Sequence, residues 1–134
     1  MKRSGTSIIF HNRKNQVLLL LRDDKPEIPY PNMWDLPGGH VEKDETPEEC
    51  IAREMMEEIE TDVSRCRRYS VYDFPDRMEY IFLMELDIDA DLIPLNEGQR
   101  LQWFSAPELP DLQLAFGFDA VLSDFFADRQ KGWR

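Results

Sequence analysis

The stretch Leu36–Thr61, LPGGHVEKDETPEECIAREMMEEIET, holds the chain's only pair of adjacent glycines and its densest acidic cluster. Its second half predicts a helix over residues 47–59. Thr46 can act as the N-cap, and Pro47 suits the first helical position because its missing N–H costs nothing there. Glu49 completes a capping box with Thr46. We expect the rest of the chain to form a scaffold around this loop and helix.

The predicted helix has two faces of opposite character. At about 100° per residue, three glutamates gather on one side, and the apolar residues fall roughly opposite. The glutamates are Glu54, Glu57 and Glu58, and the apolar set is Ile51, Ala52, Met55, Met56 and Ile59. We therefore expect one face to pack in the core and the other to carry charge.

Three carboxylates within one turn repel one another, since like charges at i,i+4 cost roughly a few tenths of a kcal/mol each. A divalent cation would reverse that balance, because Mg²⁺ and Mn²⁺ take oxygen ligands and bridge carboxylates to substrate phosphates. Gly38 and Gly39 fit such a site, because a backbone without a β-carbon can approach a metal closely and offer a carbonyl oxygen. The stretch predicts an Mg²⁺ site, with Mn²⁺ as the alternative metal.

The spacing of this stretch resembles the Nudix box, the signature of Nudix hydrolases, which cleave nucleoside diphosphates linked to another moiety. It reads Gly39-x5-Glu45-x7-Arg53-Glu54-Met55-x-Glu57-Glu58. Six fixed positions, each matched by about one residue in ten, make coincidence roughly one in a million per starting point. The resemblance implies an α+β Nudix fold over residues 1–134 as a single domain. That fold is a mixed, curved sheet between helices, with the box as a loop, helix and loop along the mouth.

One position departs from the family pattern. Nudix boxes usually end in glycine and an aliphatic residue, whereas this chain has Glu60 and Thr61 there. If the helix ends in a left-handed residue, Glu60 bears a cost of roughly 1 kcal/mol and sits at the negative end of the helix dipole. The departure concerns the helix end and leaves the acidic positions unchanged.

The resemblance also implies a metal-binding role for the box acids. Glu57 and Glu58 are the first-choice ligands, and a backbone carbonyl of Gly38 or Gly39 is a further one. Glu54 is either a ligand or the general base. We expect a metal-activated water to attack a phosphorus of a pyrophosphate, with the metal neutralising the developing charge.

Two further residues are assigned through the resemblance. Arg53 is implied to contact Glu45 and to hold Glu54 in place; its alternative is a surface i,i+4 pair with Glu49. The run Glu97-Gly98-Gln99-x3-Trp103 resembles the loop and strand of MutT-type Nudix proteins, in which the glutamate reaches the metal site. Glu97 is therefore a second candidate for ligand or general base, and an ordinary turn residue is the alternative.

Four residues are candidates for substrate binding. Arg22, at the exit of an apolar strand, could grip a phosphate or a base, or could simply be a solvated strand end. Tyr30 and Trp34 lie where the family lines its substrate pocket and could stack on a base, although core packing is favoured for Trp34. Asp119 could read the edge of a base, but the N-cap of the last helix is the favoured interpretation.

Apolar runs outline the remaining elements. Residues 7–10 and 16–21 predict a hairpin, and the continuous VLLLL of its second strand predicts burial on both faces. Residues 23–32 contain three prolines and predict a loop. Further strands are expected at 40–42, 63–74, 78–88 and 98–104. A helical turn is expected at 106–109 and an amphipathic helix at 118–129.

Composition excludes several classes of function. The net charge of −11 repels nucleic acid and anionic membranes, so we expect neither stable nucleic-acid binding nor membrane association. No window approaches about eighteen apolar residues, and the first apolar run is too short for a signal peptide. Cys50 and Cys66 are isolated, which predicts a reduced, cytoplasmic protein. Homodimerisation stays open.

A small nucleotide is the expected substrate. A nucleoside triphosphate, including an oxidised one such as 8-oxo-dGTP, comes first because of the Glu97 loop. A nucleotide sugar or ADP-ribose comes next, and capped RNA is less favoured because of the net charge. The alternative class is a non-catalytic Nudix-fold module that senses a nucleotide, although such modules tend to lose box acids that are present here. A calcium-type structural cluster would need the alternating oxygen ligands of an EF-hand loop, which are missing.

Overall fold

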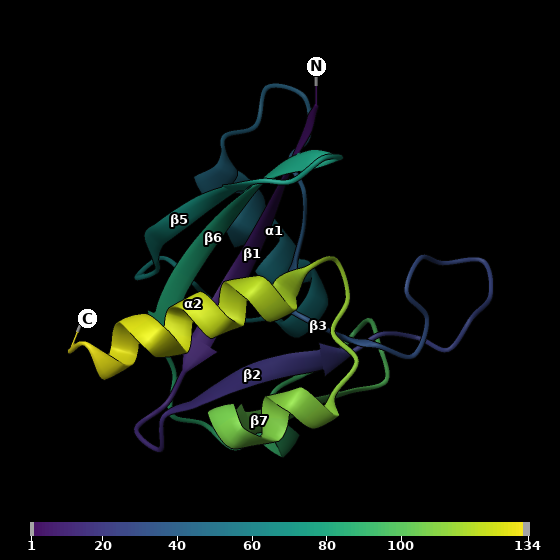
Figure 1. The fold of residues 1–134 in the computed structure, drawn as a ribbon. Coiled ribbons are helices and arrows are strands. Elements are labelled where there is room, and N and C mark those ends of the chain that lie inside the picture. Colours follow the sequence, from purple (N-terminus) through teal and green to yellow (C-terminus); the bar gives the residue numbers. More distant parts are fainter. Residues whose placement is uncertain (1, 133–134) are drawn as a thin grey trace.

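The computed structural model describes residues 2–132, which form a mixed β-sheet with a helix on each face (Figure 1). The elements in chain order are β1 (Arg3–His11), β2 (Gln16–Leu21), β3 (Trp34–Asp35), β4 (Gly38–His40), α1 (Pro47–Ile59), β5 (Arg67–Asp73), β6 (Arg77–Glu85), the short 3₁₀ helix η1 (Ala90–Leu92), β7 (Arg100–Ser105), the 3₁₀ helix η2 (Ala106–Asp111) and α2 (Phe118–Gln130).

Strand β1 is the centre of the sheet. It pairs in parallel with β6 along its whole length, from Arg3 opposite Arg77 to His11 opposite Glu85. It pairs antiparallel with β4 near its start and with β2 at its end, so its two halves have different neighbours on that side. β2 then pairs with β3 and β7, and β5 pairs with β6 at the other edge. This mixed sheet, with helices on both faces, confirms the predicted fold class.

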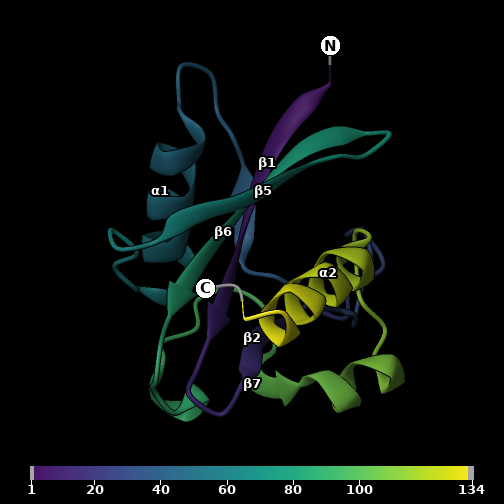
Figure 2. The ribbon, with the colours of Figure 1, turned by 60° about the vertical axis from the view of Figure 1, so that its left-hand side comes forward.

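The two faces of the sheet carry separate cores. Alternate residues of a strand point to opposite faces, and Ile8 and Phe10 pack toward α1, whereas Ile9 packs toward α2. Figure 2 shows α1 on one side of the strands and α2, in yellow, on the other. Residues 17–19 of β2 are fully buried, which confirms the prediction of a strand covered on both faces.

Helix α1 begins and ends where the sequence predicts. Thr46 Oγ1 accepts a hydrogen bond from the Glu49 backbone N–H at 3.1 Å, and the Glu49 carboxylate accepts one from the Thr46 backbone N–H at 2.9 Å. This reciprocal pair satisfies two N–H groups that the first turn would otherwise leave without partners. The predicted capping box is therefore confirmed.

The predicted orientation of α1 is wrong in part. Met56, expected in the core, is 54% exposed, and Ala52 is exposed too. Glu58, expected on the charged outer face, is only 9% exposed. The core side of the helix is the narrow row Ile51, Met55 and Ile59, spaced by four residues. A row this narrow leaves the neighbouring Glu54–Glu58 row turned toward β4.

Several strand boundaries also differ from the predictions. The short strand before α1 is Gly38–His40 rather than 40–42, because a β-carbon on Gly38 would lie only 1.9 Å from the Thr6 carbonyl oxygen; only glycine permits such close pairing with β1. Arg77, which falls between the predicted strands 63–74 and 78–88, is the buried first residue of β6. The helices described between residues 2 and 132 lack the combination of length and apolar character that crossing a membrane requires.

Candidate active site

A cavity of about 390 Å³ lies where the glycine pair, α1 and the sheet meet. Two sets of charged residues line it. We call Glu54, Glu58 and Glu97 the acidic group, and the ion pairs Arg22–Asp35 and Arg77–Glu79 the paired group. The aromatic rings of Phe116 and Phe118 also face the cavity. Its volume falls in the range of small-molecule sites, about 300–1,000 Å³.

The carboxyl groups of the acidic group lack enough positive charge nearby to favour their ionised forms. Burial, together with the charges of Glu54, Glu97 and Asp35, raises the pKa of Glu58 to about 9. A hydrogen bond from the Gly38 backbone opposes this shift only in part. Burial also raises the pKa of Glu54, against the opposing effect of the Arg53 guanidinium. These carboxylates are therefore close enough to disfavour one another's ionisation.

Arg53 organises the rim of the acidic group. Its guanidinium donates to both oxygens of Glu45, at 2.7 and 3.0 Å, and to Glu54 Oε1 at 3.0 Å. It also donates to the His40 carbonyl oxygen at 3.2 Å, which links α1 to β4. The contacts implied by the family resemblance are present, whereas the carboxylate of Glu49 serves the capping box instead of Arg53. Hydrogen bonding to Arg53 lowers the pKa of Glu45 to about 2.

The second glycine of the pair makes room for Glu54. A β-carbon on Gly39 would lie 1.6 Å from Glu54 Oε2, a distance that no pair of non-bonded atoms can adopt. The carboxylate of Glu54 therefore rests directly against the β4 backbone. With Oε1 held by Arg53, Oε2 is the oxygen that faces the glycine.

Glu57 stands apart from the other box acids. Its side chain is 58% exposed, and Arg53 approaches it at 3.4 Å. Among the described residues, it does not belong to those that line the cavity. The structure thus brings Glu54, Glu58 and Glu97 together, and leaves Glu57 at the rim.

The oxygen atoms of the acidic group have the chemistry of a site for a hard metal ion. No three Asp, Glu, His or Cys side chains between residues 2 and 132 already surround a metal position. The donors nevertheless suit a hard divalent cation, because carboxylate oxygens that repel one another in a partly buried site gain most from a positive charge. Glycine carbonyls of β4 border the same cavity. The chemistry of these donors therefore fits Mg²⁺ or Mn²⁺. The carboxylate side chains would have to move closer together to coordinate one ion.

Sequence reasoning named Arg22 as a substrate-binding candidate but did not predict the two ion pairs of the paired group. Arg22 Nη1 donates to Asp35 Oδ2 at 2.9 Å, and Arg77 Nε donates to Glu79 Oε1 at 2.6 Å. Ser7 donates to the other oxygen of Glu79. Arg77 and Glu79 stand two residues apart, so they share one face of β6. Two opposite charges at this spacing in an otherwise apolar strand are the sequence pattern from which the Arg77–Glu79 ion pair could have been predicted.

Asp35 has one oxygen without a partner. Oδ1 is buried and makes no hydrogen bond to any group in residues 2–132. Burial raises the pKa of Asp35 to about 6, against the opposing charge of Arg22. Buried polar atoms are normally hydrogen-bonded, and an exception calls for a ligand or a functional reason. This oxygen belongs to a residue that lines the cavity.

The remaining substrate-binding candidates divide in two. Arg22 lines the cavity, with its guanidinium 4.9 Å from the centre of the Phe116 ring. Trp34 is buried against Phe104, which confirms the core interpretation. Tyr30 is 45% exposed and packs on the outer side of the site against Phe116, with ring centroids 4.6 Å apart. Trp34 and Tyr30 are therefore not among the described residues lining the cavity.

The favoured interpretation of Asp119 is wrong. Helix α2 begins at Phe118, its N-cap is Gly117 with φ +79°, and Asp119 is an exposed residue of the first turn. A carboxylate there is favoured by the helix dipole without acting as a cap. Gly117, in the left-handed conformation, occupies the N-cap position that the sequence analysis had assigned to Asp119.

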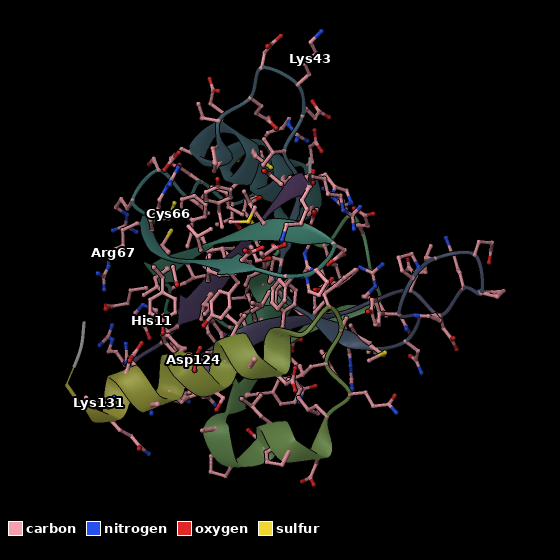
Figure 3. The ribbon with its side chains drawn as sticks, turned by 45° about the horizontal axis from the view of Figure 1, so that its top comes forward. His11, Lys43, Cys66, Arg67, Asp124 and Lys131 are labelled. Carbon is pink, nitrogen blue, oxygen red and sulfur yellow. The ribbon has the colours of Figure 1, made fainter. Side chains whose placement is uncertain are left out.

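The cysteines lie outside the cavity. Cys50 is buried in α1 with its sulfur 3.1 Å from Thr6 Oγ1, and Cys66 lies just before β5, next to Arg67 (Figure 3). Both are free thiols. The same view shows Lys43 on the loop before α1 and Lys131 after α2, at opposite ends of the molecule.

A mixed sheet between two helices, with an arginine-braced acidic helix beside a nucleotide-sized cavity, defines the class of Nudix-fold proteins. Comparison with known proteins agrees: the model of the NUDIX domain matches residues 1–125. The chain belongs to the Nudix hydrolase family, and its enzyme class is that of the Nudix pyrophosphohydrolases.

Similar proteins differ in the substrates that their names state. A Bacillus subtilis protein named "Putative 8-oxo-dGTP diphosphatase" is 30% identical over 112 residues, which cover 82% of this chain and 71% of that protein. An RNA pyrophosphohydrolase of Zymomonas mobilis is 30% identical over 152 aligned positions, covering 93% and 95%. A structure from a study of MutT from Aliivibrio salmonicida and Vibrio cholerae superposes with a TM-score of 0.78 at 23% identity, covering 96% and 99%, and shows the same fold.

Proposed function

We propose that this enzyme hydrolyses a pyrophosphate bond of a nucleoside triphosphate in an Mg²⁺-dependent reaction, with an oxidised nucleotide such as 8-oxo-dGTP as its first substrate. The observation that carries the proposal is the acidic group. Glu54, Glu58 and Glu97 line one cavity, and the pKa of Glu58 is raised to about 9 by burial and by the neighbouring carboxylates. Such a cluster costs stability in the free protein, and a bound cation would offset that cost.

The proposed metal ligands are Glu58 and Glu97, with a carbonyl oxygen of Gly38 or Gly39; Glu54 would be a ligand in the alternative in which Glu97 is the general base. Glu57 remains a proposed ligand that would have to swing from Arg53 toward the cavity. When bound, Mg²⁺ supplies charge neutralisation for the phosphates and lowers the pKa of water.

Glu54 is the proposed general base. A general base works best when its pKa lies near the working pH, and burial raises the pKa of Glu54 from its ordinary acidic value. Arg53 occupies Oε1, so Oε2 is the atom that would take the proton from the attacking water. Glu97 is the second candidate for this role, and Arg53 and Glu45 support the site by holding Glu54 in place.

The organic part of the substrate would lie toward the paired group. Phe116 and Phe118 offer ring surface, and the unpartnered Asp35 Oδ1 can accept a hydrogen bond from an N–H group of a base. The Arg22 guanidinium could contact a phosphate or a base carbonyl. The Bacillus subtilis relative, named for 8-oxo-dGTP, supports a nucleoside triphosphate ahead of a nucleotide sugar or ADP-ribose.

A hydrolysis screen tests the proposal. The purified protein is incubated with 8-oxo-dGTP, unmodified dNTPs, nucleotide sugars, ADP-ribose and 5′-triphosphorylated RNA, each with Mg²⁺, with Mn²⁺ and with EDTA, and the products are identified by mass. We expect nucleoside monophosphate and pyrophosphate from 8-oxo-dGTP only when metal is present. Preferred cleavage of RNA, the substrate named for the Zymomonas mobilis relative, would replace the substrate assignment.

Calorimetry with a non-hydrolysable nucleotide separates catalysis from sensing. Tight, Mg²⁺-dependent binding without turnover of any compound in the screen would establish a regulatory module in place of an enzyme. Turnover that persists in EDTA would overturn the metal-dependent mechanism.

A further inference from the structure

The loop that carries Glu97 is fastened to the end of α1 by the preceding residue, Asn96. The Asn96 backbone N–H donates to the Glu58 carbonyl oxygen at 2.8 Å. The Asn96 side-chain amide donates to the Glu57 carbonyl oxygen at 2.9 Å and to the Glu60 carboxylate at 3.1 Å. One residue thus makes three hydrogen bonds to the last turn of the Nudix helix.

These bonds meet a need of the helix itself. The last four carbonyls of a helix have no partner within it. Here the left-handed Glu60, with φ 52° and ψ 40°, donates its N–H to Met55, and the Thr61 N–H donates to the same carbonyl. The carbonyls of Glu57 and Glu58 receive their hydrogen bonds from Asn96. The acidic side chain that replaces the usual glycine of the box provides the third acceptor.

The loop has a second anchor three residues later. The Gln99 backbone N–H donates to the Leu21 carbonyl oxygen at 2.8 Å, and its side chain donates to the Arg22 carbonyl oxygen at 2.7 Å. Between the two anchors lie Glu97 and Gly98, which both line the cavity. Gly98 has φ +90°, and a β-carbon there would lie 2.7 Å from the Leu20 side chain. The chain between the anchors is therefore short and closely fitted.

We propose that Asn96 is a positioning residue, which places the Glu97 carboxylate next to Glu54 and Glu58 by tying its loop to the carbonyls of Glu57 and Glu58. Asn96 is exposed and is not among the described residues that line the cavity, so it acts through Glu97. This inference rests on the proposed function, because it needs Glu97 to serve the metal site.

The chemistry of the amide explains why asparagine suits this position. Its NH₂ group has two donors, and both acceptors here are oxygens. An aspartate of the same shape would face those oxygens with further oxygens and would add charge at the negative end of the helix dipole. Asn96→Asp should therefore disturb the loop more than Asn96→Ala.

A double-mutant cycle tests the inference. Mg²⁺ affinity is measured by calorimetry without nucleotide for the unmodified protein, Asn96→Ala, Glu97→Gln and the double variant, alongside kcat and KM. We expect Asn96→Ala to weaken Mg²⁺ binding by about tenfold, as for other residues that orient metal ligands. In the Glu97→Gln background the same change should have no further effect, because no carboxylate remains to be placed.

Asn12→Ala is the matched control. Asn12 also holds a turn through its side chain, between β1 and β2, and it is not one of the described residues around the cavity. It should lower the melting temperature without changing Mg²⁺ affinity. Melting temperatures of all variants, with Asn96→Asp as a second substitution, show that each one is folded when its affinity is measured.

The outcomes separate this inference from the proposed function. If Glu97→Gln leaves Mg²⁺ affinity and kcat unchanged, the metal-site role of Glu97 fails, and the role of Asn96 fails with it. If Glu97→Gln weakens binding but Asn96→Ala has the same effect in both backgrounds, or none, only the positioning role is overturned. A loss seen with Asn96→Ala that disappears in the Glu97→Gln background supports both.

Discussion

The acidic group and the paired group border the same cavity, yet they solve the problem of buried charge in different ways. In the paired group each carboxylate has its own arginine, Arg22 for Asp35 and Arg77 for Glu79. In the acidic group one arginine, Arg53, pairs with Glu54. Glu58 is buried beside other carboxylates, and both effects raise its pKa.

This difference in charge balance is the reason why the proposed function assigns the cation to the acidic group. A buried carboxylate that is matched by an arginine has its countercharge within the protein and needs no cation for charge balance, although Asp35 keeps one oxygen free for a hydrogen bond. A buried carboxylate without such a partner destabilises the free protein, and its pKa rises further: to about 9 for Glu58, against about 6 for Asp35 beside Arg22. If the proposed function is correct, the acidic group lowers the stability of the metal-free protein in exchange for metal binding, whereas the paired group supplies its own countercharges.

Replacing Glu58 should give the largest effect, with opposite signs for activity and stability. Glu58→Gln should lower Mg²⁺-dependent hydrolysis by several hundred-fold or more, since several kcal/mol of charge stabilisation goes with the metal. At pH 8 without metal it should raise the free energy of unfolding by about 2–4 kcal/mol, because glutamine resembles the protonated form that burial favours. Initial rates and urea denaturation in EDTA measure the two effects.

Glu48→Gln is the matched control for that variant. Glu48 lies on the same helix, pairs with Arg68 at the surface, and is outside the residues described around the cavity. It should leave the rate unchanged and cost at most about 1 kcal/mol. An unfolding free energy that falls in Glu58→Gln would contradict the contrast between the two groups.

The paired group should respond in the opposite direction. Arg77 is 5% exposed; it donates to Glu79 and to the Phe116 carbonyl oxygen, and it packs over the Phe74 ring at 4.5 Å. Arg77→Met should therefore cost about 3 kcal/mol of unfolding free energy, because it leaves the buried Glu79 without its cation. Urea denaturation measures it. The double variant Arg77→Met/Glu79→Gln should recover part of the loss, and no recovery would mean that packing outweighs the ion pair.

The pH dependence of stability should reveal the acidic group in the metal-free protein. The pKa of Glu58 is about 9 in the folded state, against an ordinary value of 4.5 for a glutamate, so between these values the folded protein holds one more proton than the unfolded chain. Unfolding free energy must then fall as pH rises, by up to about 1.4 kcal/mol per pH unit.

Between pH 5.5 and 7.5 we expect the unfolding free energy of the unmodified protein to fall by about 2–3 kcal/mol more than that of Glu58→Gln, with both proteins measured in EDTA. The subtraction removes groups common to both proteins, such as His11, whose pKa burial lowers and whose effect runs the other way. Equal pH profiles for the two proteins would refute the assignment of the shift to Glu58.

The sequence predicts those parts of the site that depend on local spacing. The capping box lies within one helix and its N-cap, so residues 47–59 could be placed correctly from their spacing, whereas the contacts of Arg53 with Glu45 and Glu54 were predicted through the family resemblance. The apolar run of β2 likewise predicts a doubly covered strand. These features depend on residues close to one another in the chain, so the sequence is sufficient to predict them.

Features that depend on packing between distant elements could not be predicted. The rotation of α1 that buries Glu58 and exposes Met56 is set by the sheet beneath it, and periodicity alone gives a broader apolar face. The ion pair of Arg22 with Asp35 joins two strands across a proline-rich loop. The docking of Asn96 on α1 spans nearly forty residues. The sequence gives the identity of these residues, but it does not show which distant residues they contact.

The smallest predicted effect concerns the unpartnered oxygen of Asp35. Asp35→Asn keeps the shape of the side chain and an acceptor for Arg22, so the unfolding free energy should change by about 1 kcal/mol or less. It turns the free acceptor into a donor, and a base N–H that relied on that oxygen would lose about tenfold in kcat/KM. The informative quantity is the ratio of kcat/KM for 8-oxo-dGTP to that for dATP, measured in both proteins. A ratio that changes places Asp35 beside the base, whereas an equal loss for both nucleotides would mean that Asp35 only holds Arg22, and that the two groups differ in charge balance alone.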